Sequence, residues 1–259
     1  MAKHTKNINA RKAQFNEVKI IDFLIKFSNC SPLNSVEPDN FTETLAFLSA
    51  VQMHEETDRA FKMAELIYNY CRNDLNWRVI ESIMWCANPK KVKNDVLDLY
   101  CTHGNPSDIV LIAPNNNYLG VSLKNYNSKS RVNHKATASS VFGLTEEQVT
   151  TKTDAYNNIK KLITGGSITS RDFMDKVIHI NDLPYIEVIG SGDYHRTEVE
   201  LKHPIESLNK FQIHFNDFSE KIEFTVEQHN GLIKGEVNFK NSRKKNAVPR
   251  YNMLTFILE

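Results

Sequence analysis

Two stretches decide the fold, Asp108-Ile-Val-Leu-Ile-Ala113 and Tyr118-Leu-Gly-Val-Ser-Leu-Lys124. The first is an unbroken run of β-branched and aliphatic residues of strand length, which is typical of a buried central strand. Pro114–Asn117 (PNNN) lies between them and is rich in turn-forming residues. The two stretches therefore predict a β-hairpin in which an acid begins one strand and a lysine ends the next. Both side chains can then point to the same end of the sheet.

The chain upstream of this hairpin has a mostly helical pattern, from about residue 15 to 101. Apolar residues from Leu45 to Cys71 follow helical spacing. A further helix is expected to begin at Asp74, to carry Trp77, Met84 and Trp85, and to end before Pro89. The segments 18–27 and 95–100 are apolar and fit either a helix or a strand.

Strands dominate the pattern downstream. We expect helices over 146–163 and 170–177, a strand over 184–190, a hairpin over 221–239 and a terminal strand over 252–258. The fold class is thus α/β, with a mixed central sheet flanked by helices. We expect a helical N-terminal region, residues 1–74, packed on a core of residues 75–259 that ends in a C-terminal β-hairpin, the whole forming one compact domain.

The composition is that of an ordinary globular protein. The chain has 259 residues, of which 41% are hydrophobic and 24% charged. No apolar run is long enough for a membrane span, and the basic, polar Met1–Ala13 lacks the apolar segment of a secretory signal. The four cysteines are scattered, which argues against a zinc ribbon and against a disulfide scaffold. A cytoplasmic protein without membrane contact is expected.

The hairpin also carries a recognisable pattern, Asn105-Pro106-Ser107-Asp108 followed by Ser122-Leu123-Lys124. Over about residues 75–125 the chain resembles the PD-(D/E)XK nuclease superfamily, in which a proline and an aspartate begin one strand and acid-any-lysine ends the next. Two departures are visible: Ser107 separates the proline from the acid, and Ser122 replaces the acid of the second motif. Gly120-Val-Ser-Leu-Lys124 is similar to the variant of the family that has this serine.

The resemblance implies a restriction-endonuclease-like core and a Mg²⁺-dependent DNA endonuclease, with Mn²⁺ as a substitute cation. Asp108 would be a metal ligand, and the backbone carbonyl of Leu123 a further one. Lys124 would position the attacking water, and Ser122 would complete the second motif. Hydrolysis would use this water rather than a covalent intermediate.

A serine is a poor metal ligand, so another acid is expected to compensate. Glu81 is the first choice, because on the helix expected after Asp74 it interrupts an apolar stripe, where a carboxylate is costly unless it is paired or metal-bound. The second choice is Glu65, which has Lys62 beside it as a salt-bridge partner. We interpret Glu187, inside the strand over 184–190, as the solvent side of a half-covered strand.

The net charge is only +1, so any binding to DNA needs local basic stretches. Two such stretches lie at about 124–135 and 240–250. Both could grip phosphates, and solvated loops remain the alternative for each. The residues expected to contact DNA are Lys129, Arg131, Lys135, Arg243, Lys244 and Lys245.

Two alternative functions stay open at this point. Because Ser122 removes one acid, the chain could be a non-catalytic nucleic-acid-binding or structural protein on a degenerate nuclease fold. It could also be an RNA endonuclease on the same fold. A homodimer is open as well, since double-strand cutters of this family often work as dimers. The absence of a Walker motif and of a GxSxG elbow disfavours an ATP-driven motor and a serine hydrolase.

Overall fold

The computed structural model describes residues 8–36, 41–87, 95–101, 107–125, 130–133, 142–177, 183–192, 196–202, 210–228, 231–239 and 255–258. The chain divides into two compact units: Met1–Ser128 with Asn181–Pro204, and Lys129–Ile180 with Ile205–Glu259. The division therefore does not fall near residue 74, and the second unit is made of two separate segments of the chain.

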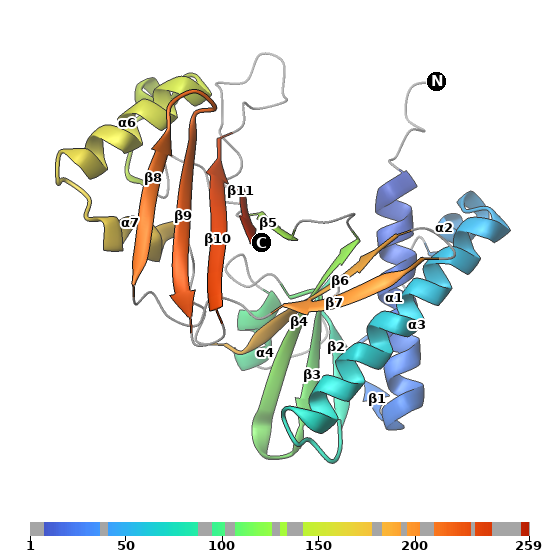
Figure 1. Ribbon diagram of the computed structural model, residues 1–259. Coiled ribbons are helices and arrows are strands. Elements are labelled where there is room, and N and C mark those ends of the chain that lie inside the picture. The colour runs from blue at the N-terminus through green and yellow to red at the C-terminus, as the bar shows by residue number, and fades with distance from the viewer. Residues whose placement is uncertain are drawn as a thin grey trace. The chain divides into compact units, whose positions relative to one another are not determined.

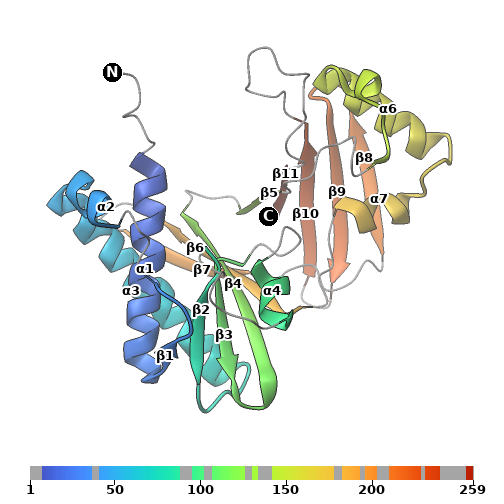
Figure 2. The ribbon, with the colours of Figure 1, turned by 180° about the vertical axis from the view of Figure 1, so that it is seen from behind.

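The first unit is a mixed sheet with helices on both faces (Figures 1 and 2). Its helices are α1 (Ile8–Ser28), α2 (Phe41–Phe47), α3 (Ala50–Asn73) and α4 (Asp95–Cys101). Its strands are β1 (Ser31–Pro32), β2 (Ser82–Trp85), β3 (Ile109–Ala113), β4 (Asn117–Asn125), β6 (Tyr185–Ser191) and β7 (Glu198–Lys202). A mixed central sheet flanked by helices is thus confirmed.

The order of the strands is β1-β2-β3-β4-β6-β7. The neighbours β2, β3 and β4 run antiparallel, β4 and β6 run parallel, and β7 closes the edge antiparallel to β6. The predicted hairpin is β3 and β4, joined by the 3₁₀ turn Pro114–Asn116. Asn115 and Asn116 both have positive φ there, a conformation that asparagine tolerates better than most residues.

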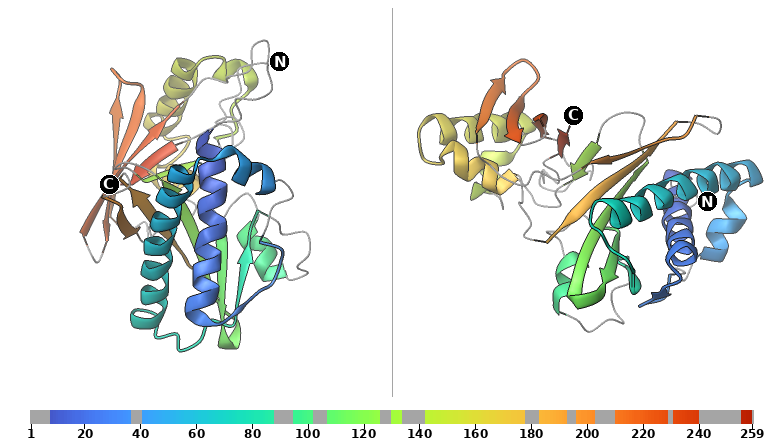
Figure 3. Two further views of the ribbon diagram at one scale, coloured as in Figure 1. Left: turned by 90° about the vertical axis from the view of Figure 1, so that its right-hand side faces the viewer. Right: turned by 60° about the horizontal axis from the view of Figure 1, so that its bottom comes forward.

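Helices α1 and α3 lie side by side on one face of this sheet, as the left view of Figure 3 shows. Their apolar stripes, which include Ile20, Leu24, Met63 and Ile67, pack on the alternate strand residues that point to this side. The opposite face carries a smaller core, in which α4 contributes Leu97 and Tyr100. The ambiguous segments 18–27 and 95–100 are therefore both helical.

The prediction of a helix that begins at Asp74 is wrong. Asp74 instead ends α3, where its N–H donates to the carbonyl of Tyr70, and the following apolar run forms β2. Ile83, Met84 and Trp85 are all buried, because β2 is covered on both faces. Such a strand has no alternation of polar and apolar residues, so a short apolar run can be mistaken for a buried helix.

The second unit pairs a curved antiparallel sheet with helices α6 (Lys152–Thr164) and α7 (Ser170–Val177). Its sheet has the order β5-β11-β10-β9-β8. These strands are β5 (Ser130–Asn133), β8 (Phe211–Asn216), β9 (Lys221–Gln228), β10 (Gly231–Asn238) and β11 (Thr255–Leu258), and a 3₁₀ turn, Glu146–Val149, precedes α6. The predicted hairpin over 221–239 is β9 and β10, and Phe224, Val226 and Val237 bury their side chains against the helices.

Candidate active site

Asp108 lies directly before β3, held between two neighbouring strands. Its Oδ2 accepts a hydrogen bond of 2.6 Å from the N–H of Leu123. Its own N–H donates to the carbonyl of Val121 at 2.8 Å, and its carbonyl accepts from the N–H of Cys86 at 2.9 Å. The carboxylate is therefore fixed beside the end of β4 by backbone contacts on both sides.

Lys124 and Ser122 lie at that end of β4, as the hairpin predicted. The Nζ of Lys124 donates to the Oγ of Ser122 at 2.6 Å and lies 4.0 Å from the Oδ2 of Asp108. Ser122 is fully buried and the side chain of Lys124 is 18% exposed. The ammonium group is thus held over the hairpin by one hydroxyl and one carboxylate.

Gly120, two residues before Ser122, leaves room for the segment that leads into Asp108. A Cβ atom at this position would collide with the Oγ of Ser107 and would lie 3.0 Å from the ring of Tyr100. The glycine of the motif is therefore required by close packing between β4, α4 and the residue before Asp108.

The carbonyl of Leu123 points to the same side of β4 as its N–H, because both groups of one strand residue face the same neighbouring strand. That N–H is bonded to Asp108, so the carbonyl also faces the β3 side. The expected backbone ligand and the expected carboxylate ligand are consequently on the same side of the strand.

The structure places a second acid, Glu17 of α1, near enough to Asp108 and Lys124 for their charges to act on its pKa. The Oε2 of Glu17 accepts a hydrogen bond of 3.0 Å from the indole N–H of Trp85. Burial raises the pKa of Glu17 to about 7, and the charge of Asp108 acts in the same direction. The bond from Trp85 and the charge of Lys124 oppose this shift only in part.

Sequence reasoning missed Glu17 because the segment around it could not be assigned to a helix. Its neighbours Asn16 and Val18 are buried. Glu17 therefore lies at the edge of the buried face of α1. Because an acid that compensates for Ser122 was expected on a helix, Glu17 would have been a candidate if residues 8–28 had been assigned as a helix.

The two acids expected from sequence do not reach the site. Glu81 is exposed, and its N–H donates to the carbonyl of Ile112 at the far end of β3. The strand residues between that end and Asp108 place the two acids roughly 15 Å apart, at about 3.3 Å per residue. Glu65 is exposed on α3, on the side away from the buried Ala64 and Ile67.

Glu187 was interpreted as solvent-facing, and this is wrong. It is 1% exposed, and on the parallel neighbour β6 it is the register partner of Ser122. The strand is covered on both faces, so its polar residue has no solvent side to face.

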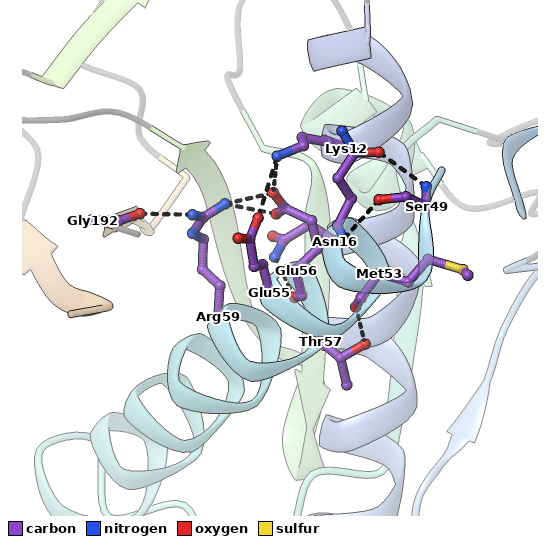
Figure 4. Close-up of polar contacts among 10 residues, drawn as sticks. Lys12, Asn16, Ser49, Met53, Glu55, Glu56, Thr57, Arg59 and Gly192 are labelled. Carbon is purple, nitrogen blue, oxygen red and sulfur yellow. Dashed lines mark hydrogen bonds and ion pairs between the residues drawn. The ribbon is translucent and has the colours of Figure 1, made fainter. Parts of the chain in front are cut away.

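The position of α1 is set by a polar network that it shares with α3 (Figure 4). The carboxylate of Glu56, fully buried, accepts two bonds of 2.7 Å from Arg59 and lies 3.6 Å from the Nζ of Lys12. The side-chain amide of Asn16 donates to the backbone carbonyl of Glu56 at 3.2 Å. Arg59 also donates to the carbonyl of Gly192, just after β6, at 2.9 Å. The network ties the turn of α1 that carries Glu17 to α3 and to the end of β6.

The backbone of Trp85 is held in a similar way from the other side. The side chain of Asn34 accepts from the N–H of Trp85 at 2.9 Å and donates to its carbonyl at 2.7 Å. Asn34 is itself buried, and its amide is satisfied by these two bonds. The bonds extend the hydrogen bonding at the edge of the sheet and hold the backbone of Trp85, whose indole contacts Glu17.

Five of the residues expected to contact DNA, Lys129, Lys135, Arg243, Lys244 and Lys245, lie outside the described residues. Arg131 lies on β5 as the register partner of Ile257, and its side chain is outside the described part as well.

Within the described residues, no three side chains of His, Cys, Asp or Glu are grouped so that they could hold a metal ion. No helix in this part of the chain has both the length and the apolar character needed to cross a membrane. No protein-family model, no curated protein and no solved structure matches the chain. The function must therefore be argued from the site itself.

Proposed function

We propose that this protein is a Mg²⁺-dependent DNA endonuclease with a restriction-endonuclease-like core, a variant of the PD-(D/E)XK type. One observation carries the proposal: Asp108 and Lys124 meet where β3 begins and β4 ends, and Glu17 of α1 lies near enough for both charges to act on its pKa. The hairpin and the mixed sheet with helices on both faces are further support. In this proposal Glu17, and not Glu81, is the helical acid that compensates for the serine at position 122.

The donor set fits Mg²⁺, which prefers oxygen ligands, keeps several waters and is commonly bound by one or two carboxylates. Asp108, Glu17 and the carbonyl of Leu123 would hold the ion. The raised pKa of Glu17 supports this assignment, because its causes are burial first and the charge of Asp108 second, and a bound cation would offset both. When bound, Mg²⁺ would supply positive charge that stabilises the negatively charged phosphate, and would lower the pKa of a water molecule bound to it.

Lys124 is the residue that acts on the reacting centre. Its ammonium group, held by Ser122 and Asp108, would orient the attacking water and stabilise the negative charge that builds up on the phosphate in the transition state. The bond from the N–H of Leu123 keeps the carboxylate of Asp108 in place before substrate binds, so little reorganisation is needed.

The test is cleavage of supercoiled plasmid DNA with and without Mg²⁺. We expect wild-type protein to nick or linearise the plasmid only with the cation. Lys124→Met should lower the rate at least about 100-fold, the effect of removing one preorganised donor. The control variant is Glu81→Gln, which changes an exposed residue beside the far end of β3 and should cut at the wild-type rate.

Other results would point to the alternatives. Wild-type protein that retards DNA in a gel but never cuts it, in Mg²⁺ or in Mn²⁺, would favour a non-catalytic binding protein, as the serine of the second motif suggests. Digestion of matched single-stranded RNA but not DNA would favour the RNA endonuclease. Undiminished cutting by Lys124→Met would remove the assignment of this site.

A further inference from the structure

Strand β8 is the outermost strand at one side of the second unit's sheet (Figure 1). Among the described residues it pairs with one strand, β9, which runs antiparallel to it. Within that part of the chain the other side of β8 is therefore an open edge. An open edge presents backbone N–H and C=O groups on which a further strand can pair.

The backbone groups that point outward from β8 follow from its bonding to β9. The N–H of Glu227 donates to the carbonyl of Lys210 at 3.1 Å, so Lys210, just before β8, is a residue that bonds to β9. In an antiparallel pair, residues that bond to the neighbouring strand alternate with residues that do not. The N–H and C=O groups of Phe211, Ile213 and Phe215 therefore point away from β9, toward the open edge.

The other strands at the sheet edges of the described structure carry features that discourage pairing, and β8 does not. Strand β1 has two residues and ends in Pro32, β5 has four residues and includes Arg131, and β7 is charged at three of its five residues. Short length, proline and charge are the usual means by which proteins protect an edge strand. Strand β8 has six residues, Phe-Gln-Ile-His-Phe-Asn, with no proline, acid, lysine or arginine.

A second copy of β8 fits this edge when a twofold axis passes through Ile213. Antiparallel pairing then places Ile213 opposite its own copy and Phe211 opposite Phe215, and each of these pairs exchanges two backbone hydrogen bonds. Their side chains, which the core of this unit covers only in part, would meet on one face. On the other face the exposed Gln212 lies opposite His214, so no like charges oppose each other in the neutral-histidine form.

We propose that the chain forms a homodimer in which two copies of β8 pair antiparallel and join the sheets of the two second units into one. The interface is isologous and closes on itself, because each copy uses the same edge. The inference is independent of the proposed function, since β8 belongs to the second unit and Asp108, Lys124 and Glu17 belong to the first.

The experiment is sedimentation equilibrium of the full chain over a range of protein concentrations at neutral pH. Wild-type protein should pass from one chain to two. Gln212→Lys with His214→Lys sets like charges opposite each other across the interface and should raise the dissociation constant at least about tenfold. Gln212→Glu with His214→Lys sets opposite charges there and should dimerise at least as tightly as wild type. The control, Asn157→Lys with Thr164→Lys, adds positive charge at exposed positions of α6 and should leave the constant unchanged.

Hydrogen exchange of the wild-type chain gives a second readout that needs no variant. The amides of Phe211, Ile213 and Phe215 should become protected only at concentrations where the chain is a dimer, whereas the amide of His214, which bonds to β9, should be protected at all of them. Wild-type protein that stays monomeric at every concentration would overturn the inference. A dimer that forms without protecting the three outward amides, or that Gln212→Lys with His214→Lys leaves equally tight, would overturn it as well.

Discussion

At Glu17, burial and the charge of Asp108 both favour the protonated carboxyl group, and they raise its pKa from 4.5 to about 7. The opposing effects, from the Trp85 hydrogen bond and from Lys124, are smaller. In the unfolded chain none of these neighbours is present. Between pH 4.5 and 7 the folded protein therefore keeps a proton that the unfolded chain releases, so this residue makes the free energy of unfolding fall as pH rises through that window.

Glu17→Gln should remove this dependence, because the amide is neutral at every pH and can still accept from Trp85. We expect the variant to be more stable than wild type at pH 8 in a chelating buffer, by roughly 2 kcal/mol, and about as stable at pH 4.5. Urea denaturation at the two pH values measures this difference. The control is Glu65→Gln, which removes an exposed acid of α3 and should keep the pH dependence of the wild type. A gain for Glu17→Gln that was equal at both pH values would contradict the explanation.

At the scale of elements, α3 carries a buried ion pair between Glu56 and Arg59, and Glu56 also lies 3.6 Å from the Nζ of Lys12 on α1. Truncating one partner of such a pair leaves a buried charge uncompensated, whereas replacing both by apolar residues is often neutral. Arg59→Met should therefore lower the free energy of unfolding by roughly 3 kcal/mol. The double variant Glu56→Met with Arg59→Met should recover most of that loss. Equal stability of the single and double variants, measured in urea, would show that the pair is not coupled.

The elements also show where prediction from sequence succeeds. Segments whose polar and apolar residues alternate, or that follow helical spacing, were predicted well: α7, and the hairpin of β9 and β10. The motif hairpin was also predicted, although β3 and most of β4 are buried on both faces, because turn residues separate its two strands. The errors fall on runs buried on both faces. For β2, no periodicity distinguished a strand from a helix. The assignment of Glu81 as a metal ligand depended on that expected helix, so it was lost with it. For α1, the segment 18–27 fitted either a helix or a strand, and Glu17, just before it, was not considered. Asp108 and Lys124 were found because a hairpin relates them locally, whereas Glu17 comes near them only through the packing of α1 on the sheet.

The whole molecule carries almost no net charge, with 32 basic and 31 acidic residues. Several of its cations are neutralised within the second unit, where Lys152 lies 2.9 Å from Glu220 and Lys160 lies 2.6 Å from Asp217. A uniform basic surface cannot therefore account for DNA binding, and the proposal requires a few cations in the two basic stretches to contact phosphates.

Each such contact releases counterions, so the affinity for DNA should fall with salt at a slope set by the number of contacts. The double variants Lys129→Ala with Arg131→Ala, and Arg243→Ala with Lys244→Ala, should each weaken binding and lower the slope of log K against log salt by about 2. Lys152→Ala with Lys160→Ala removes the same charge from ion-paired positions and should leave the slope unchanged. Fluorescence anisotropy with a labelled duplex, from about 50 to 200 mM salt, measures all three. If the slope changes equally in all three variants, only the overall charge matters; if it changes in none of them, both basic stretches are solvated loops.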